Sequence, residues 1–499
     1  MLLPVRRVAA GDGGVTGIIP MFRILARASA VILSGLLLTQ CASVPDVSDL
    51  ADRREQVKIS TASGWLTYEQ SKKILSGIER KGDPQDFLSR HLEVEEAVAG
   101  VPLVSGNRIS LFTDGPETYK AMEAAIRSAK QFVHMQSYIF EDDETGNRFV
   151  SLLEKKQAEG VPVAIIVDGV GTLSTPKEMF DRIRAAGIQL LVFNPVNPLE
   201  ARTPWSPNER NHRKILVVDG RTGFVGGINI SGVYSTPASG GSGSGSGGGS
   251  GGKGLSVGSG SGEPKDAKTA PWRDTHVQID GPVVADIERV FLGTWEAQRG
   301  EPLVQRDFYP KIAPMGQQVV RILANQPGEN EGHSIYLTLM SAISSAQKSV
   351  HITMAYFVPD PAFLEALRQA AQRGVDVALI LPGFADSSMV FHAGRSHYRE
   401  LIEAGVKIYE RRDVLLHAKT AVVDDVWATV GSSNMDWRSF AINHEINAVV
   451  LGPEFGMRME RLFQDDLKRS VPITSEDWSD RPISDRMKEF FSRFAERWL

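Results

Sequence analysis

Residues 211–220, NHRKILVVDG, decide the fold of this chain. His212 and Lys214 precede a four-residue apolar run, and Asp219 follows it. The run predicts a buried strand, and residues two apart on a strand share a face. We therefore expect the imidazole of His212 and the ammonium group of Lys214 to point into one cavity.

The same pattern recurs at 415–425, LLHAKTAVVDD. His417, Lys419 and Asp424 have the spacing of the first copy. A lone His-x-Lys pair is usually a solvated strand end, but two copies with identical spacing indicate a shared function. Each copy continues into a glycine turn that ends in an asparagine, Asn229 or Asn434, and each asparagine lies 17 positions after its histidine. The turn can return the amide to the same cavity.

The sequence around the motifs is duplicated as well. AIRSAKQFVHMQSYIFED at 125–142 recurs as AISSAQKSVHITMAYFVP at 342–359, and EGVPVAIIVDG at 159–169 recurs as RGVDVALILPG at 373–383. Apolar runs and helical periodicity predict alternating strands and helices; in the first copy these are strands at 132–140 and 161–169 and helices near 121–128 and 149–158. We expect an α/β fold of two similar halves related by a pseudo-two-fold axis, with the two motifs meeting at the interface.

Length and composition fit a globular protein of two or three domains. The 499 residues are 42% hydrophobic and 23% charged, and the net charge is −5. An acidic balance argues against coating nucleic acid, which requires a cationic surface. We divide the chain into an N-terminal signal, a mostly helical preface, a first half and a second half, at 1–41, 42–100, 101–305 and 306–499.

The N-terminal segment has the pattern of a bacterial lipoprotein signal. Arg23 and Arg27 precede an apolar run at 28–38, and Cys41, the one cysteine, follows. The run is shorter than the roughly 20 residues of a membrane span. We expect translation from Met21, lipidation at Cys41 and attachment to the bacterial cell envelope on the periplasmic side. An uncleaved membrane anchor is the alternative, since glutamine precedes the cysteine where the cleavage box has a small residue.

Two further segments have a distinctive composition. The stretch 235–271 is mostly Gly and Ser, which bury too little apolar surface to offset the entropy of ordering, and we predict a disordered surface loop inside the first half. The tail at 485–499 predicts an amphipathic helix with its aromatic residues on one side, namely Phe490, Phe491, Phe494 and Trp498. We expect this side to pack on the protein, with membrane contact as the alternative.

The doubled motif resembles that of the phospholipase D superfamily, and the resemblance covers residues 105–470. The blocks at 356–360, 397–410 and 272–282 are more narrowly similar to bacterial cardiolipin synthases. The resemblance implies two halves, each a mixed sheet flanked by helices, with one active site between them. One departure is Gly227, where serine is commoner in the family; loss of the serine hydroxyl is expected to weaken one phosphate contact without necessarily abolishing activity.

The resemblance also implies a mechanism for phosphodiester exchange. His212 is expected to attack phosphorus as the nucleophile, and His417 to act as general acid and base. Lys214 and Lys419, with Asn229 and Asn434, are expected to hold the nonbridging oxygens, so that no metal or cofactor is required. Asp219 and Asp424 are expected to hold the strand ends and the lysine-bearing segments.

Each histidine needs a partner for its other ring nitrogen. Family members use downstream carboxylates, and Glu445, 28 residues after His417, fits this role. Asp274 is the corresponding candidate in the first half. His134 and His351 also correspond between the copies but lie inside apolar strands, so we interpret them as structural. DGVGT at 168–172 lacks the Lys-Ser/Thr of a phosphate loop and is interpreted as a turn.

These expectations favour an enzyme that uses a phospholipid substrate at a membrane surface. The first hypothesis is a phosphatidyltransferase of cardiolipin-synthase type. A phospholipase D hydrolase, a secreted phosphodiesterase or nuclease, and a lipid-binding lipoprotein without catalysis are the alternatives. The same His and Lys residues serve transfer and hydrolysis, so the motif does not separate those two.

Overall fold

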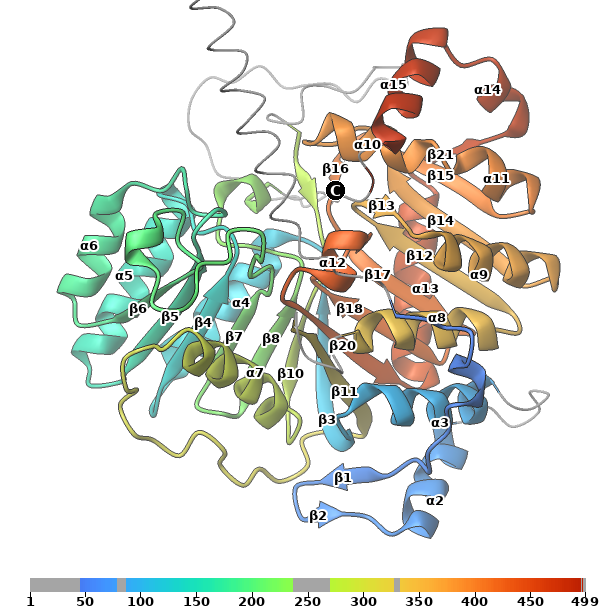
Figure 1. Ribbon diagram of the computed structural model, residues 1–499. Coiled ribbons are helices and arrows are strands. Elements are labelled where there is room, and N and C mark those ends of the chain that lie inside the picture. The colour runs from blue at the N-terminus through green and yellow to red at the C-terminus, as the bar shows by residue number, and fades with distance from the viewer. Residues whose placement is uncertain (1–44, 79–86, 237–269, 327–332, 495, 497–499) are drawn as a thin grey trace, which may run out of the picture. The chain divides into compact units, whose positions relative to one another are not determined.

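The computed structural model of this chain describes residues 45–78, 87–236, 270–326, 333–494 and 496 (Figure 1). The predicted signal with Cys41 and most of the Gly/Ser insert, 237–269, lie outside these residues. Within the described ranges, no helix has both the length and the apolar character needed to cross a bilayer.

The first half is a seven-stranded mixed sheet. Its parallel strands alternate with helices, and α4, α5 and α6 pack on one face while α7 packs on the other. Strands β5 and β7 are buried throughout, because both faces of the sheet are covered. In spatial order the strands are β6 (Gln189–Phe193), β5 (Val163–Asp168), β4 (Val133–Ser137), β7 (Ile215–Val218), β8 (Thr222–Gly226), β10 (His276–Asp280) and β3 (Leu103–Phe112). The helices are α4 (Gly115–Ser128), α5 (Glu144–Ala158), α6 (Lys177–Ala185) and α7 (Val284–Ala297).

The second half repeats this order. Its helices α8, α9 and α11 pack on one face and α13 on the other, and β21 (Ser470–Ile473) extends the outer edge. The strands are β15 (Lys407–Arg411), β14 (Asp376–Pro382), β12 (Ser349–Met354), β17 (Lys419–Val423), β18 (Trp427–Gly431), β20 (Glu445–Leu451) and β11 (Gln318–Asn325). The helices are α8 (Ser334–Ser345), α9 (Pro361–Gln372), α11 (Tyr398–Glu403) and α13 (Pro453–Leu467). The duplication predicted from the sequence is therefore present in the strand order.

The two halves join through equivalent strands. β3 and β11 occupy the same place in the two sheets and pair antiparallel, with Val104 opposite Val320. Antiparallel pairing of equivalent strands is the arrangement that a two-fold axis produces. A shared apolar core lies under α7 and α13 and takes residues from both sheets. The motif strands β7 and β17 are consequently held by one continuous sheet (Figure 1).

The preface contains strands as well as helices, so the expectation of a mostly helical segment is incomplete. β1 (Ile59–Thr61) and β2 (Gly64–Trp65) form a hairpin, followed by α2 (Tyr68–Ile78) and α3 (Phe87–Ala99). Gly64 has a φ of +115°, a backbone angle that residues other than glycine rarely adopt. β1 pairs parallel with the start of β3, at Leu103 and Val104, ahead of the residues of β3 that pair with β10.

The C-terminal helix forms, but its aromatic side does not pack on the described protein. α15 (Ile483–Arg493) follows α14 (Ser475–Ser479) and contacts α10 (Ser388–Arg395). Phe490, Phe491 and Phe494 are 59–72% exposed, whereas Glu489 is 3% exposed. The expectation of aromatic packing is wrong because two half-buried arginines, Arg395 and Arg481, bind the buried Glu489 and turn the opposite face of the helix outward.

Candidate active site

Short strand pairs between the halves place both motif histidines. β16 (Leu415–Leu416) runs parallel to β9 (Trp272–Arg273), and the His417 amide donates to the Arg273 carbonyl at 2.7 Å. The same arrangement recurs in the other motif. There Asn211 forms an isolated parallel β-bridge with His444, and the His212 amide donates to the His444 carbonyl at 3.0 Å. Each histidine therefore lies beside the segment of the opposite half that leads into a carboxylate residue.

The two expected carboxylates contact the histidines crosswise. His212 Nδ1 lies 3.0 Å from Glu445 Oε1, and His417 Nδ1 lies 2.6 Å from Asp274 Oδ2. Asp274 lies in the first half and Glu445 in the second, so each carboxylate binds the histidine of the other half. Sequence spacing cannot show this crossing, because it follows from the strand pairs between the halves.

The crosswise contacts leave Nε2 of each ring for chemistry. A carboxylate at Nδ1 favours the tautomer with the proton there. Burial lowers the pKa of His212 to about 4 despite the opposing effect of Glu445. Burial, reinforced by Lys419, also lowers the pKa of His417. Both imidazoles are therefore neutral near pH 7 in the substrate-free site, and either Nε2 is available as a nucleophile.

The positive charge of the site lies on the two lysines. Lys214 and Lys419 are almost completely buried, and each ammonium group donates to the backbone carbonyl of its own motif histidine. Burial lowers the pKa of Lys214 to about 7 and that of Lys419 to about 8. Burial outweighs the opposing effect of Glu445 and Asp274 on both lysines, and an entering anion would raise both pKa values again.

The carboxylates themselves stay ionised. Burial raises the pKa of Glu445, but His212, Lys214 and the Ser432 hydroxyl outweigh it, and the net pKa is lowered. Asp274 behaves in the same way, with His417 and Lys419 outweighing burial. Ionised carboxylates at Nδ1 can stabilise the positive charge that either imidazole acquires during the reaction.

The difference between Gly227 and its counterpart Ser432 follows from the lengths of the two carboxylate side chains. The Ser432 hydroxyl donates to Glu445 Oε2, so it contacts a carboxylate rather than a phosphate position. At Gly227 a Cβ atom would lie 2.1 Å from Asp274 Oδ1. The shorter aspartate brings its carboxylate close to the turn, and only glycine fits there. The departure from the family pattern is thus compensated within the first half, and the weaker phosphate contact stays a prediction.

The two asparagines are in different environments. Asn229 accepts from the Ile139 amide at 3.0 Å and donates to the Tyr234 hydroxyl at 3.1 Å. The oxygen and one N–H of its amide are therefore bound to the scaffold. Asn434 is 5% exposed, and its side-chain oxygen has no hydrogen-bond partner among the described residues. That oxygen can accept a hydrogen bond from a substrate hydroxyl, whereas donation to a phosphate oxygen would have to come from the amide N–H2.

Asp219 and Asp424 hold the chain where it enters β4 and β12. Asp219 accepts from the amides of Lys130, Gln131 and Phe132 at 2.7–3.0 Å. Asp424 accepts from the amides at 347–349 at 2.8–3.0 Å. Both residues have φ above +50°. With their oxygens bound to backbone amides, these carboxylates are placed for structure and not for proton transfer.

Several residues that complete the site were not predicted. Asp168, in the DGVGT turn, accepts from the Asn211 amide at 2.8 Å and pairs with Arg210, which fastens the segment before His212. The Tyr138 ring meets the His212 ring edge-on at 5.1 Å, and Lys214 lies over it. On the other side, the Trp272 ring lies 5.0 Å from that of His417. In the sequence, Asp168 looks like an ordinary turn residue, and Tyr138 and Trp272 look like ordinary core aromatic residues.

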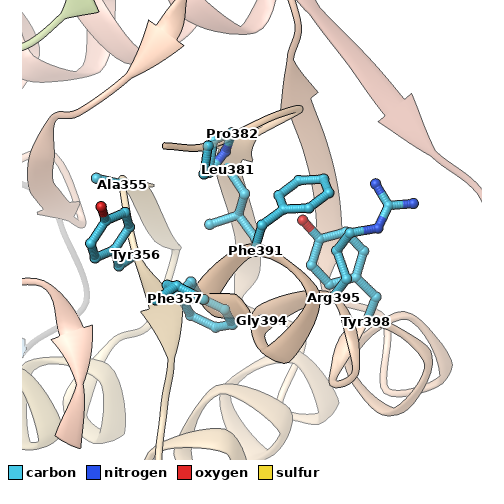
Figure 2. Close-up of a pocket in the computed structure, with 11 residues that line it drawn as sticks. Ala355, Tyr356, Phe357, Leu381, Pro382, Phe391, Gly394, Arg395 and Tyr398 are labelled. Carbon is cyan, nitrogen blue, oxygen red and sulfur yellow. The ribbon is translucent and has the colours of Figure 1, made fainter. Parts of the chain in front are cut away.

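An apolar recess adjoins the site on the side of the second half (Figure 2). Tyr356 stands at one edge and donates to Asp386 at 2.6 Å. Next to it, the Ala355 amide donates to the carbonyl of Ala418, between the motif histidine and lysine. Phe391 and other residues of α10 form the opposite wall. The recess therefore connects the catalytic segment to α10.

His134 and His351, which correspond to each other in the two halves, make structural contacts. His134 Nδ1 lies 2.7 Å from Glu288 and stacks on Phe291, and His351 Nδ1 lies 2.7 Å from Glu460. These pairs fasten α7 and α13 to the sheet. Among the described residues, no group of three or more His, Cys, Asp or Glu side chains is placed to bind a metal ion.

Comparison with known families finds one match in two pieces. Residues 122–234 and 339–467 match the family described as "Cardiolipin synthase, PLD-like domain". The two pieces correspond to the two halves of the structure, and each contains one copy of the motif.

Similar proteins include several cardiolipin synthases. The chain is 35% identical over 403 residues to that of Geobacillus kaustophilus, covering 80% of this chain and 74% of that protein. It is 35% identical over 437 residues to that of Alkalihalophilus pseudofirmus, covering 87% and 78%. Among solved structures, phosphatidylserine synthase from Haemophilus influenzae has a TM-score of 0.59 at 14% identity and covers 81% of this chain and 99% of its own; this likeness concerns the fold alone.

Proposed function

The chain belongs to the cardiolipin synthase family of phospholipase D-like enzymes, and on this premise we propose that it transfers a phosphatidyl group between phospholipids through a phosphohistidine intermediate. The observation that supports the proposal most directly is the crosswise pair of imidazoles. Two neutral rings, each held at Nδ1 by a carboxylate of the other half, lie beside two buried lysines.

The first step is attack by Nε2 of His212 on phosphorus. A phosphodiester anion entering between the lysines raises the pKa of both ammonium groups and of His417. The bond from phosphorus to the headgroup oxygen breaks, and the protonated His417 donates its proton to the departing alcohol. The lysines and the amide of Asn434 bind the nonbridging oxygens, and Glu445 stabilises the charge on the phosphorylated His212.

The second step reverses the first with another alcohol. His417, now neutral, takes the proton of the incoming hydroxyl while its oxygen attacks phosphorus, and the bond to His212 breaks. With phosphatidylglycerol as donor and acceptor, the products are cardiolipin and glycerol. With water as acceptor, the product is phosphatidic acid.

The test is incubation of the purified protein with labelled phosphatidylglycerol in vesicles. Cardiolipin with release of glycerol is the expected outcome. Phosphatidic acid alone would assign a hydrolase, and absence of turnover would overturn the enzymatic proposal. Trapping of labelled phosphate on His212 in a His417→Ala protein would assign the nucleophile, whereas trapping on His417 in a His212→Ala protein would reverse the two roles.

A further inference from the structure

The C-terminal helix α15 is amphipathic, but its apolar face is exposed and its polar face contacts the protein. Its acidic residue Glu489 is buried and pairs with Arg481 at 2.9 Å and with Arg395 at 3.7 Å. Arg395 is itself fixed, because it pairs with Glu410 at 2.6 Å and lies over the ring of Phe391 in the wall of the recess. The polar face is thus the anchored face (Figure 2 shows Arg395 beside Phe391).

The apolar residues of α15 all point away from the described protein. They recur at three- and four-residue intervals, which places them on one stripe of the helix. The ring of Phe490 contacts those of Phe491 and Phe494 edge-on, with centroids 5.6 and 5.1 Å apart. The exposed fractions in this stripe are 56–74%, for Ile483, Met487, Phe490, Phe491 and Phe494. An apolar stripe of this kind, held outward by buried ion pairs, indicates an apolar surface that it contacts.

The charges beside the stripe indicate what kind of surface that is. Arg486, Lys488 and Arg493 are exposed along α15. By their spacing in the helix, they flank the apolar stripe on both sides. Apolar residues with basic residues at their borders match the interface of an anionic phospholipid bilayer, where rings enter the acyl boundary and cations remain at the headgroups.

The stripe lies on the side of the molecule where the active site opens. α15 packs on α10, which forms a wall of the recess beside Tyr356, and Met389 on α10 is 51% exposed. In the first half, Leu173 and Leu199 follow the carboxyl ends of β5 and β6 and are 70% and 92% exposed. Because β4 and β12 lead into the site at their carboxyl ends, exposed apolar residues border it in both halves.

We propose that α15 docks on an anionic phospholipid bilayer and, with the apolar loops of the first half, holds the active-site opening against it. The orientation toward the site rests on the proposed function, whereas the docking itself does not. This contact is separate from any anchor at Cys41. It would bring lipid headgroups to the active site without removing a lipid from the membrane completely.

The test uses the full chain with Cys41→Ala, which leaves no other cysteine. An environment-sensitive fluorophore is attached at Met487→Cys, and a matched control carries it at Trp65→Cys, which is 63% exposed in the preface. Phosphatidylcholine vesicles with phosphatidylglycerol should shift the emission at position 487 to the blue, and brominated acyl chains should quench it. The position 65 probe should respond to neither, and vesicles of phosphatidylcholine alone should give a weaker response.

A second variant, Phe490→Ser with Phe494→Ser, tests the energetics. We expect about tenfold or greater loss of affinity for the same vesicles, since both rings leave the interface. Transfer from vesicle-borne phosphatidylglycerol should fall in parallel, while cleavage of a soluble p-nitrophenyl phosphodiester should stay unchanged. Absence of quenching at position 487 on vesicles that the enzyme turns over would overturn the docking proposal, as would burial of the probe in a dimer without lipid. Quenching without any turnover would keep the docking and overturn the proposed function.

Discussion

Glu445→Gln is the sharpest perturbation of the crosswise site. Glutamine keeps the shape of the side chain, and its oxygen can still accept from His212 Nδ1. Its new N–H2 group can donate to the Ser432 hydroxyl, which already accepts from the Ile446 amide at 3.0 Å. The substitution therefore removes a buried charge without opening a cavity. Glu445 raises the pKa of His212 and of Lys214, so its loss lowers both.

The magnitude follows from the charge that His212 acquires when it is phosphorylated. Glu445 is completely buried and lies 3.0 Å from the ring, so no solvent replaces its effect. Neutralising a buried carboxylate that orients a catalytic histidine costs roughly 10²–10⁴ in kcat, or about 3–5 kcal/mol in the barrier. We expect KM to change little, since the lysines that bind the phosphate remain.

The assay is the pH dependence of transfer from labelled phosphatidylglycerol. Lys214 acts in its charged form, so activity falls as pH rises through its pKa, which is about 7 in the free site. A lower pKa in the variant moves this alkaline limb to lower pH. Glu460→Gln is the matched control, because Glu460 holds the structural His351 at 2.7 Å and should leave kcat unchanged. Equal losses in both variants, or an alkaline limb that does not move, would refute the reasoning.

Three further outcomes are expected. Chelation by EDTA should leave turnover unchanged, because the lysines supply the charge at phosphorus; loss that one divalent ion restores would contradict this mechanism. Gly227→Ser should lower activity and thermal stability, since a Cβ atom would lie 2.1 Å from Asp274 Oδ1, and a wild-type melting temperature would show that the turn can move. Cys41→Ala should lack the acyl label that the wild type incorporates, and equal labelling of both proteins would exclude lipidation at this cysteine.

Some properties of the site follow from local sequence. Asp219 and Asp424 follow short apolar strands, and their carboxylates bind backbone amides as their position at the strand ends suggests. His134 and His351 lie inside apolar runs, and they contact carboxylates on covering helices. In these cases the sequence displays the position of the residue, at the end of a strand or inside an apolar run, although the partners lie 76–154 positions away in the chain.

The sequence by itself determined the duplicated α/β halves and the identity of the His and Lys residues, because strand periodicity and repeat spacing are local properties. Only the tertiary structure decided which carboxylate serves which histidine, since pairing of β9 with β16 and of Asn211 with His444 joins residues 143 and 233 positions apart. The tertiary structure also decided which face of α15 is exposed. The helical period specifies an apolar stripe, but burial of Glu489 between two arginines determines that this stripe faces outward.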